Sequence, residues 1–196
     1  MLVELHSNPI KYIEVHDFLD EATLARWATT LARMPLSEGD VVSPSNRTLV
    51  SPHKKNKNAW LGAPNDLALE FRDRAWGQPI RKALLDMNDY LFKAHATIDE
   101  GSFLYSKYEQ GDYYQWHRDR TPYLTYNLVI KSADEGGLFQ FSESPTEPHS
   151  AVETVENKSN TLIIFPSFLL HQVTPVWAGE RLTLQYFQNS SLIQST

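Results

Sequence analysis

Three side chains in the second half of the chain have the types and the spacing of a metal site: His117, Asp119 and His171. On a β-strand, residues two apart point to the same face of the sheet, so His117 and Asp119 could reach one ion. His171 follows Asp119 by 52 residues and would come from a distant strand that lies nearby in a rolled sheet. Two neutral imidazoles and one carboxylate on one face of an octahedron leave three adjacent positions open. This set predicts an Fe(II) centre that binds further ligands, because a closed four-ligand site has no room for them.

Each part of this pattern has a simpler explanation when it is taken alone. A His-x-Asp spacing occurs by chance in many proteins, and a histidine beside Leu169–Leu170 is more often a core or surface residue. The ordered set, within a part of the chain that has a β pattern, is what favours a metal site. The remaining histidines have no such partners in the sequence, and we expect no metal chemistry from them: His6, His16, His53, His95 and His149.

A cation is expected behind the metal site, ten residues after His171. Polar and apolar residues alternate from this point. The polar positions are Arg181, Thr183 and Gln185, and the apolar positions are Leu182, Leu184 and Tyr186. Such alternation is ordinary for a strand at a solvent edge. In a jelly roll, however, the polar face would point to the interior, where Arg181 needs an anion, and a guanidinium fork binds a carboxylate with two hydrogen bonds.

The elements that must position these residues differ between the two halves of the chain. Apolar residues at helical spacing predict one helix after Asp20, its N-cap, ending before Pro35. Two more are predicted from about Asn65 to Trp76 and from Pro79 to Leu91. After these, short segments rich in β-branched and aromatic residues predict strands. These segments are Phe103–Tyr108, Leu124–Ile130, Leu138–Phe141, Ala151–Val155, Thr161–Phe165, His171–Val173 and Arg181–Phe187.

These elements predict a single α+β domain over residues 1–196, with helical support at about 17–97 and a β core at about 101–190. Seven or eight short strands at this spacing suggest a sandwich or jelly roll with the helices packed outside it. Residues 36–64 are polar and show no firm period, apart from a short strand at Thr48–Val50. They are equally consistent with a loop that covers the substrate and with a plain insertion. Within them, we expect His53–Lys57 to be a solvated loop.

Composition excludes several classes of function. The chain has 196 residues, of which 41% are hydrophobic and 21% charged, as in ordinary globular proteins. Its net charge of −6 argues against a nucleic-acid-binding surface, and no apolar run approaches the about 20 residues that span a membrane. The chain has no cysteine, which excludes disulfides and thiolate chemistry. Together with an N-terminus that has no secretory core, this favours a cytoplasmic location.

The candidate residues and their flanking motifs resemble the Fe(II)/2-oxoglutarate-dependent oxygenases, and more closely their prolyl-4-hydroxylase-like branch. The likeness covers roughly residues 12–188. The central pattern His-x-Asp…His…Arg is carried by His117, Asp119, His171 and Arg181. The flanking motifs are the start Asp17–Asp20, the Tyr-x-x-Gly-x-x-Tyr segment Tyr108–Tyr114, the Gly136–Gly137 turn, and the runs His171–Val176 and Gly179–Arg181.

The resemblance implies a double-stranded β-helix core and a role for each matching residue. The implied Fe(II) ligands are His117, Asp119 and His171. Arg181 would pair with the far carboxylate of 2-oxoglutarate, Thr183 could share it, and Tyr108 would lie near the co-substrate. Tyr114 would lie near the substrate, so that Tyr114 and Arg181 are the implied catalytic residues. The implied cofactors are Fe(II), 2-oxoglutarate and O₂, with ascorbate as an optional addition.

The implied reaction is hydroxylation of a C–H bond with release of succinate and CO₂, in a prolyl or other residue of a peptide or protein. Aromatic faces favour proline-rich segments. The aromatic side chains that would suit a prolyl ring are Tyr113, Tyr114, Trp116 and Trp177. Many prolyl-4-hydroxylases use Lys where this chain has Arg181, which leaves the subfamily open. The strand after the His-x-Asp loop could turn either Tyr126 or Asn127 toward the co-substrate.

Two other functions are compatible with the same residues. The chain could be a non-enzymatic jelly-roll module that binds a glycan or a small molecule, with structural roles for its His and Asp residues. It could also be a cupin-like metal enzyme that does not use 2-oxoglutarate. Arg181, ten residues after His171, argues against the second alternative.

Overall fold

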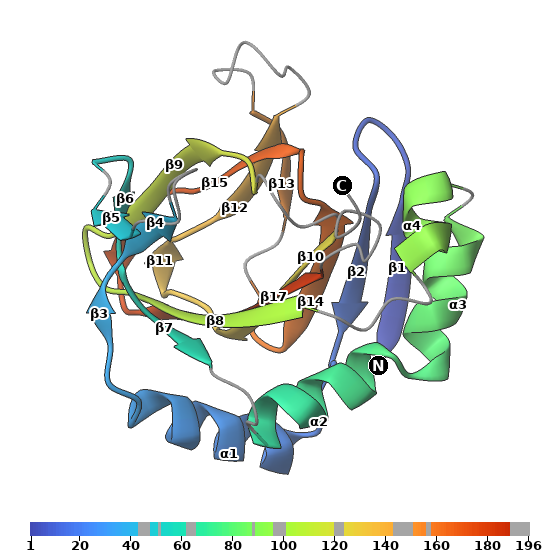
Figure 1. The fold of residues 1–196 in the computed structure, drawn as a ribbon. Helices are drawn as coiled ribbons and strands as arrows, with labels where there is room; N and C mark the ends of the chain where they lie inside the picture. Colours follow the sequence, from blue (N-terminus) through green and yellow to red (C-terminus); the bar gives the residue numbers. More distant parts are fainter. Residues whose placement is uncertain are drawn as a thin grey trace, which may run out of the picture.

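The computed structural model describes residues 1–42, 48–50, 52–61, 66–87, 89–95, 101–119, 124–142, 151–155 and 158–188. Two antiparallel sheets face each other, and helices lie along the outside of the larger sheet (Figure 1). The predicted α+β fold with a double-stranded β-helix core is confirmed. No helix in these ranges is long and apolar enough to cross a membrane.

The larger sheet contains eight strands in the order β1-β2-β14-β10-β17-β8-β7-β3. Their bounds are β1 Leu2–His6, β2 Tyr12–His16, β14 Thr161–Pro166, β10 Leu124–Lys131, β17 Arg181–Gln188, β8 Gly101–Tyr108, β7 Lys57–Leu61 and β3 Ser37–Glu38. Strand β17 is hydrogen-bonded on both sides, to β10 and to β8, so its side chains are held in a fixed register.

The smaller sheet has five strands in the order β13-β12-β15-β9-β6. Their bounds are β13 Ala151–Val155, β12 Phe139–Ser142, β15 Leu170–Val173, β9 Tyr113–His117 and β6 Lys54–Lys55. Two further pairs complete the strands: β11 Glu135–Gly136 with β16 Val176–Ala178, and β4 Asp40–Val42 with β5 Thr48–Val50. The short strand predicted at Thr48–Val50 is therefore present.

Four helices lie in the described part of the chain: α1 Glu21–Ala32, α2 Asp66–Ala75, α3 Gln78–Asp86 and α4 Tyr90–His95. Asp20 caps α1 as predicted, since its Oδ1 accepts a hydrogen bond of 2.8 Å from the backbone N–H of Thr23. The single helix predicted from Pro79 to Leu91 was wrong in its extent. Asp89 Oδ1 accepts a bond of 3.0 Å from the backbone N–H of Leu91 and so starts a new helix.

The description of the first half as helical was incomplete, because the described residues before residue 62 form seven strands. Residues 12–15 of β2 are all buried, so this strand shows no polar–apolar alternation. Strands β3 and β6 have two residues each, which is too short for any periodic signal. The described part of residues 36–64 thus forms strands rather than one irregular covering loop, while residues 43–47, 51 and 62–64 lie outside the described ranges.

Alternate residues of the larger sheet enter two different cores. On the outer face, Leu182 and Leu184 of β17 pack in one apolar cluster with Trp27 of α1, Phe71 of α2 and Ile80 of α3. The inner face of the sheet is turned toward the smaller sheet. The apolar side chains gathered between the two sheets include Tyr108, Phe139, Phe141, Ile163, Phe165 and Val173. The polar positions of β17 therefore point to the interior, as the sequence predicted.

Candidate metal and co-substrate site

His117, Asp119 and His171 come together at one end of the smaller sheet. His117 ends β9 and lies opposite His171 of the neighbouring strand β15. The Nε2 atoms of His117 and His171 lie 3.8 and 3.7 Å from the two carboxylate oxygens of Asp119, and one possible ligand atom of each residue lies within 4.8 Å of the others. We refer to these three residues as the metal-ligand cluster.

The geometry that unites these residues differs from the predicted one. Asp119 lies beyond the end of β9, so it does not share a strand face with His117. Instead, cross-strand pairing joins the two histidines. The backbone N–H of Asp119 donates a 2.9 Å hydrogen bond to the carbonyl of Ser167, which holds the carboxylate beside them.

Both imidazoles are oriented for metal binding. His117 Nδ1 donates to the carbonyl of Gln115 and His171 Nδ1 to the carbonyl of Leu169, each at 2.8 Å. A carbonyl only accepts, so each Nδ1 carries the proton and each Nε2 keeps a free lone pair. Burial also lowers the pKa of His117 well below its ordinary value, and the neighbouring His171 adds to this. The neutral form that a metal ligand requires is therefore favoured.

The carboxylate of the cluster has a partner that sequence reasoning missed. Thr125 Oγ1, on β10, donates a 2.8 Å hydrogen bond to Asp119 Oδ2 and lies 3.0 Å from the Ser167 hydroxyl. Neither Thr125 nor Ser167 belongs to a recognisable motif. Their role follows from the fold, because β10 and the turn after β14 both reach the end of β9.

Arg181 is wholly buried at the start of β17, opposite Tyr108 of β8, and its Cζ lies 5.6 Å from the Tyr108 ring centroid. Among the described residues, its Nε and Nη2 atoms have no hydrogen-bond partner, and neither has Thr183 Oγ1 on the same strand face. Burial lowers the pKa of Arg181 to about 10, so the side chain still carries its charge at neutral pH. An uncompensated buried cation is strongly destabilising, so this pair of residues marks a place for an anionic ligand that accepts hydrogen bonds.

The Gly136–Gly137 turn makes room for the stem of Arg181. Both glycines have positive φ angles, 73° and 61°. A Cβ atom on Gly137 would lie 3.3 Å from Cδ of Arg181, and one on Gly136 would lie 2.2 Å from the carbonyl oxygen of Pro175. The turn therefore needs glycine both for its backbone conformation and for the close approach of its neighbours.

The open choice between Tyr126 and Asn127 is resolved by the sheet register. Asn127 lies opposite Gln185 on the inner face, is 1% exposed, and has no hydrogen-bond partner for its amide oxygen or nitrogen. Tyr126 points outward, where its ring stacks on Trp76 at 5.9 Å and its hydroxyl donates to Gln188 Oε1. Of these two residues, Asn127 is thus the one that faces the site, on the same face of β10 as Thr125.

Two tyrosines connect the cation to the metal-ligand cluster. Burial, with Asp119 adding to it and Arg181 opposing it, raises the pKa of Tyr108 to about 12. The Tyr114 ring stacks on the His117 ring, with centroids 3.4 Å apart and planes 11° apart, and burial beside Asp119 raises its pKa as well. Both phenols therefore stay neutral and can donate hydrogen bonds.

The interpretation of His53–Lys57 as a solvated loop was wrong at Lys54 and Asn56, which are buried. Lys54 belongs to β6, lies opposite Tyr114, and is only 7% exposed. Its Nζ atom is 4.9 Å from the centroid of the Tyr114 ring, which makes it a cation above an aromatic face. A run of polar residues gives no sign of such burial, because the burial comes from pairing with a strand far along the chain.

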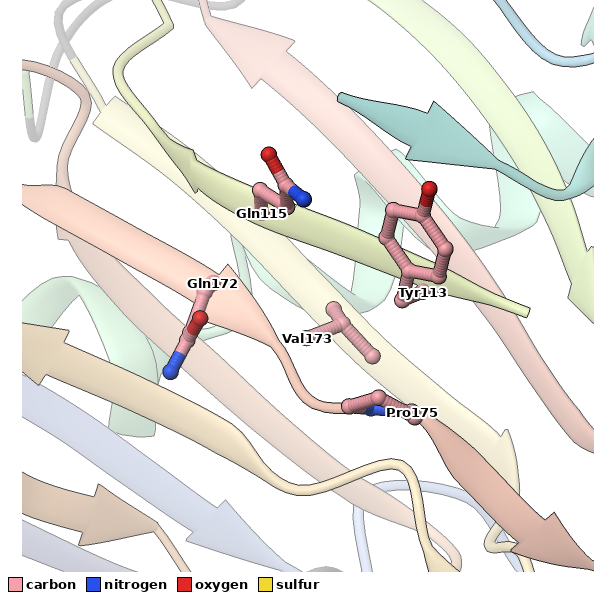
Figure 2. A pocket seen from close by; sticks show the side chains of 5 residues that line it. All are labelled: Tyr113, Gln115, Gln172, Val173 and Pro175. Carbon is pink, nitrogen blue, oxygen red and sulfur yellow. The ribbon is translucent and has the colours of Figure 1, made fainter. Parts of the chain in front are cut away.

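Two of the aromatic side chains expected at the substrate lie elsewhere. Trp177 is 64% exposed. Its neighbour Val176 is hydrogen-bonded to Gly111 and Asp112, just before β9 starts. Trp177 therefore lies near the start of β9, whereas the metal ligand His117 lies at its end. Tyr113 lines a groove of about 370 Å³, shown in Figure 2, together with Gln115, Gln172, Val173 and Pro175. Gln172 alternates with His171 along β15, so it lies across the sheet from the metal-ligand cluster.

Comparisons with known proteins agree with this arrangement. The sequence profile of the 2OG-Fe(II) oxygenase superfamily matches residues 103–189, which include the metal-ligand cluster and Arg181. A PKHD-type hydroxylase of Burkholderia ambifaria is 24% identical over 169 residues, which are 78% of this chain and 74% of that protein.

Solved structures show the same fold. A prolyl-4-hydroxylase from Pseudomonas putida has a TM-score of 0.67 at 18% identity, covering 93% of this chain and 94% of the other. A prolyl hydroxylase from Trichoplax adhaerens, in complex with a peptide fragment of the hypoxia inducible factor oxygen degradation domain, has a TM-score of 0.69 at 15% identity, covering 96% and 89%. With the profile match over its β core and the hydroxylase relative, these findings support a 2-oxoglutarate-dependent oxygenase similar to the 2OG-Fe(II) superfamily, and the solved structures show that its fold is prolyl-4-hydroxylase-like.

Proposed function

We propose that this oxygenase hydroxylates a C–H bond of a prolyl or other residue in a peptide or protein, converting 2-oxoglutarate and O₂ to succinate and CO₂. The observation that carries the proposal is the buried guanidinium of Arg181, whose Nε and Nη2 atoms have no hydrogen-bond partner among the described residues, inside the same β core as the metal-ligand cluster. A non-enzymatic binding module has no need for this combination of a His-Asp-His set and a buried cation.

The donor sets fit the two groups that the family implies. Two neutral imidazoles and one carboxylate suit Fe(II), with coordination positions left for other ligands. Arg181 and Thr183 offer unsatisfied donors to a carboxylate, and Asn127 offers both a donor and an acceptor between them and Thr125. A dicarboxylate with a metal-chelating end therefore suits this row of side chains.

When bound, the iron would supply the activation of O₂ that is coupled to decarboxylation of the 2-oxo acid. The chain itself positions the reactants. Arg181 and Thr183 would fix the far carboxylate of the co-substrate, and the neutral Tyr108 would donate a hydrogen bond from the neighbouring strand. Around the cluster, Phe139 and Phe165 lie 5.4 and 4.9 Å from the His171 ring and exclude water from that side.

A peptide substrate is supported by the solved relative that holds a peptide and by an aromatic side chain at the rim. Phe168 is 63% exposed and follows Ser167, whose carbonyl holds Asp119. With Tyr114 stacked beside the metal-ligand cluster, Phe168 offers an apolar face to a prolyl ring.

The test is a succinate-release assay with Fe(II), 2-oxoglutarate, ascorbate and a panel of proline-containing peptides, followed by mass spectrometry for the gain of one oxygen atom. We expect succinate release to require Fe(II), and one peptide class to gain oxygen. A peptide series in which every proline is replaced by alanine separates prolyl hydroxylation from hydroxylation of another residue. A purified protein that binds neither Fe(II) nor 2-oxoglutarate would overturn the proposal.

A further inference from the structure

A second group of metal-ligating side chains lies on the hairpin of β1 and β2, at the edge of the larger sheet. Glu4 of β1 is paired directly with Glu14 of β2, and His6 and His16 flank this pair on the same face of the hairpin. We call these four residues the hairpin cluster. The expectation that His6 and His16 have no such partners was therefore wrong, because antiparallel pairing joins residues that are ten positions apart.

The four Nε2-to-oxygen separations within the hairpin cluster are similar. His6 Nε2 lies 3.9 Å from Glu4 Oε2 and 3.6 Å from Glu14 Oε2. His16 Nε2 lies 3.7 Å from an oxygen of each of the same glutamates. One ligand atom each of Glu4, His6 and Glu14 lies within 4.8 Å of the others. The four distances from an imidazole Nε2 to a carboxylate oxygen all exceed the about 3.2 Å limit of an N–H···O hydrogen bond.

The metal-ligand cluster provides an internal standard for these distances. There, the two imidazole Nε2 atoms lie 3.7 and 3.8 Å from the carboxylate oxygens of Asp119. The hairpin cluster repeats the same Nε2-to-oxygen spacing four times, with one more carboxylate. Spacing of this kind leaves room for an ion between the ligand atoms, whereas direct ion pairs between protonated histidines and glutamates would close to hydrogen-bond length.

The side chains of the hairpin cluster are also held in place. The His6 ring stacks on Tyr12, with centroids 4.1 Å apart and planes 5° apart, and His6 Nε2 is buried without a hydrogen-bond partner. His16 Nδ1 lies 3.5 Å from the Thr161 hydroxyl, so its Nε2 is turned to the glutamates. This arrangement, with a polar partner on the other ring nitrogen, is common among metal-binding histidines.

The surroundings favour a cation. The side chain of Glu14 is only 7% exposed although it is a carboxylate. A further carboxylate, Glu153, accepts a hydrogen bond of 3.2 Å from the hydroxyl of Tyr12, the residue that stacks on His6. A buried carboxylate among others is stable when a positive charge lies close by.

We propose that the hairpin cluster binds a divalent transition-metal ion, best suited to Zn²⁺, through His6 Nε2, Glu4 and Glu14, with His16 Nε2 as the fourth ligand. Four nitrogen and oxygen ligands suit a closed structural site, in contrast to the open positions of the iron site. Among the described strands, β1 is hydrogen-bonded only to β2, and β2 pairs with β14 over three residues. The ion thus ties the N-terminal strand pair together at the edge of the sheet.

The test separates the two sites by mutation. In a variant carrying His117→Ala and Asp119→Ala, we expect equilibrium dialysis against Zn²⁺, with the metal measured by atomic absorption, to show one equivalent bound. Adding His6→Gln and His16→Gln to this variant should abolish Zn²⁺ binding. Adding the control His53→Gln instead should leave one equivalent of Zn²⁺ bound. In the variant without the metal-ligand cluster, Zn²⁺ should also raise the melting temperature only when the hairpin cluster is intact, because the ion binds the folded state.

Two results would overturn this proposal without touching the proposed oxygenase function. One is absence of Zn²⁺ binding in the variant without the metal-ligand cluster, with a normal circular dichroism spectrum. The other is binding that persists with both His6→Gln and His16→Gln. If the double histidine variant does not fold, the single change His6→Gln is decisive, since this side chain is 31% exposed and its loss should weaken Zn²⁺ binding at least 10-fold without unfolding the hairpin.

Discussion

The two faces of the larger sheet come from alternate residues of the same strands, yet they are completed in different ways. On the outer face, Leu182 and Leu184 of β17 are enclosed by helix side chains such as Trp27 and Phe71. On the inner face, Arg181, Thr183 and Asn127 are buried with polar atoms that have no partner. On the outer face, the protein itself buries the apolar side chains. On the inner face, the polar atoms gain hydrogen-bond partners only when a ligand is present. Stability and binding are thus assigned to opposite faces of one strand, and variants on each face should separate them.

The largest effect is expected from Asp119→Ala, which removes one of the three ligands of the metal-ligand cluster. Decarboxylation of 2-oxoglutarate should fall to background. The loss should be greater than for Thr125→Val, which removes only the hydrogen bond to Asp119 and should lower activity about 10- to 100-fold. Succinate release and Fe(II) binding measure both changes. Turnover retained by Asp119→Ala would refute the assignment of the ligand.

Arg181→Met should lose binding without losing the fold. The variant removes a buried charge that has no partner in the free protein, so the free energy of unfolding without ligand should stay the same or rise. The dissociation constant of 2-oxoglutarate should rise at least about 30-fold, corresponding to about 2 kcal/mol. Calorimetry and thermal melts check the two halves of this prediction. A large loss of stability in the ligand-free protein would show that Arg181 is structural.

Leu184→Ala tests the outer face, three positions further along the same strand. Removing a wholly buried leucine should lower the free energy of unfolding by about 2–5 kcal/mol. The dissociation constant of 2-oxoglutarate should not change at a temperature where the variant is folded. Urea unfolding combined with calorimetry distinguishes the two effects. A shift in co-substrate affinity comparable to that of Arg181→Met would contradict the separation of the two faces.

Thr183→Val makes a smaller change on the inner face. The shape of the side chain is kept, and one hydroxyl without a partner in the free protein is removed. We expect the dissociation constant of 2-oxoglutarate to rise about 2- to 10-fold, as for one hydrogen bond of about 0.5–1.5 kcal/mol, with no loss of stability. The matched change Thr125→Val should instead weaken Fe(II) binding, since Thr125 contacts Asp119.

The smallest effect is expected in the supporting layer, from Asp20→Ala at the start of α1. Hydrogen bonds from the backbone and hydroxyl of Thr23 lower the pKa of Asp20 from 3.8 to about 2. Its stabilising effect is therefore present above about pH 4 and disappears as the pH falls through 2. We expect the variant to melt about 2–4 °C lower at neutral pH. The difference from the unmodified chain should vanish below about pH 2, and 2-oxoglutarate binding should not change.

The parts that could be predicted from the sequence are those with a local signal. Asp20 predicts the start of a helix, and the polar–apolar alternation in Arg181–Tyr186 predicts a strand with one polar face. The residues that were missed depend on register between distant strands. Lys54 is buried because β6 pairs with β9, Thr125 reaches Asp119 because β10 begins beside the turn after β14, and His6 meets Glu14 across a hairpin. No local pattern contains this information, since it arises only when the strands are aligned.

The continuous pairing of β17 with β8 and β10 has a consequence for how this protein can change over generations. Substitutions at single positions alter one face and leave the other intact. Inserting or deleting one residue within Arg181–Gln188 would instead exchange the faces of everything beyond it, turning leucines toward the co-substrate and polar groups toward the helices. We therefore expect relatives to vary in composition along this strand while keeping its length, and to accept added residues in the connections between strands.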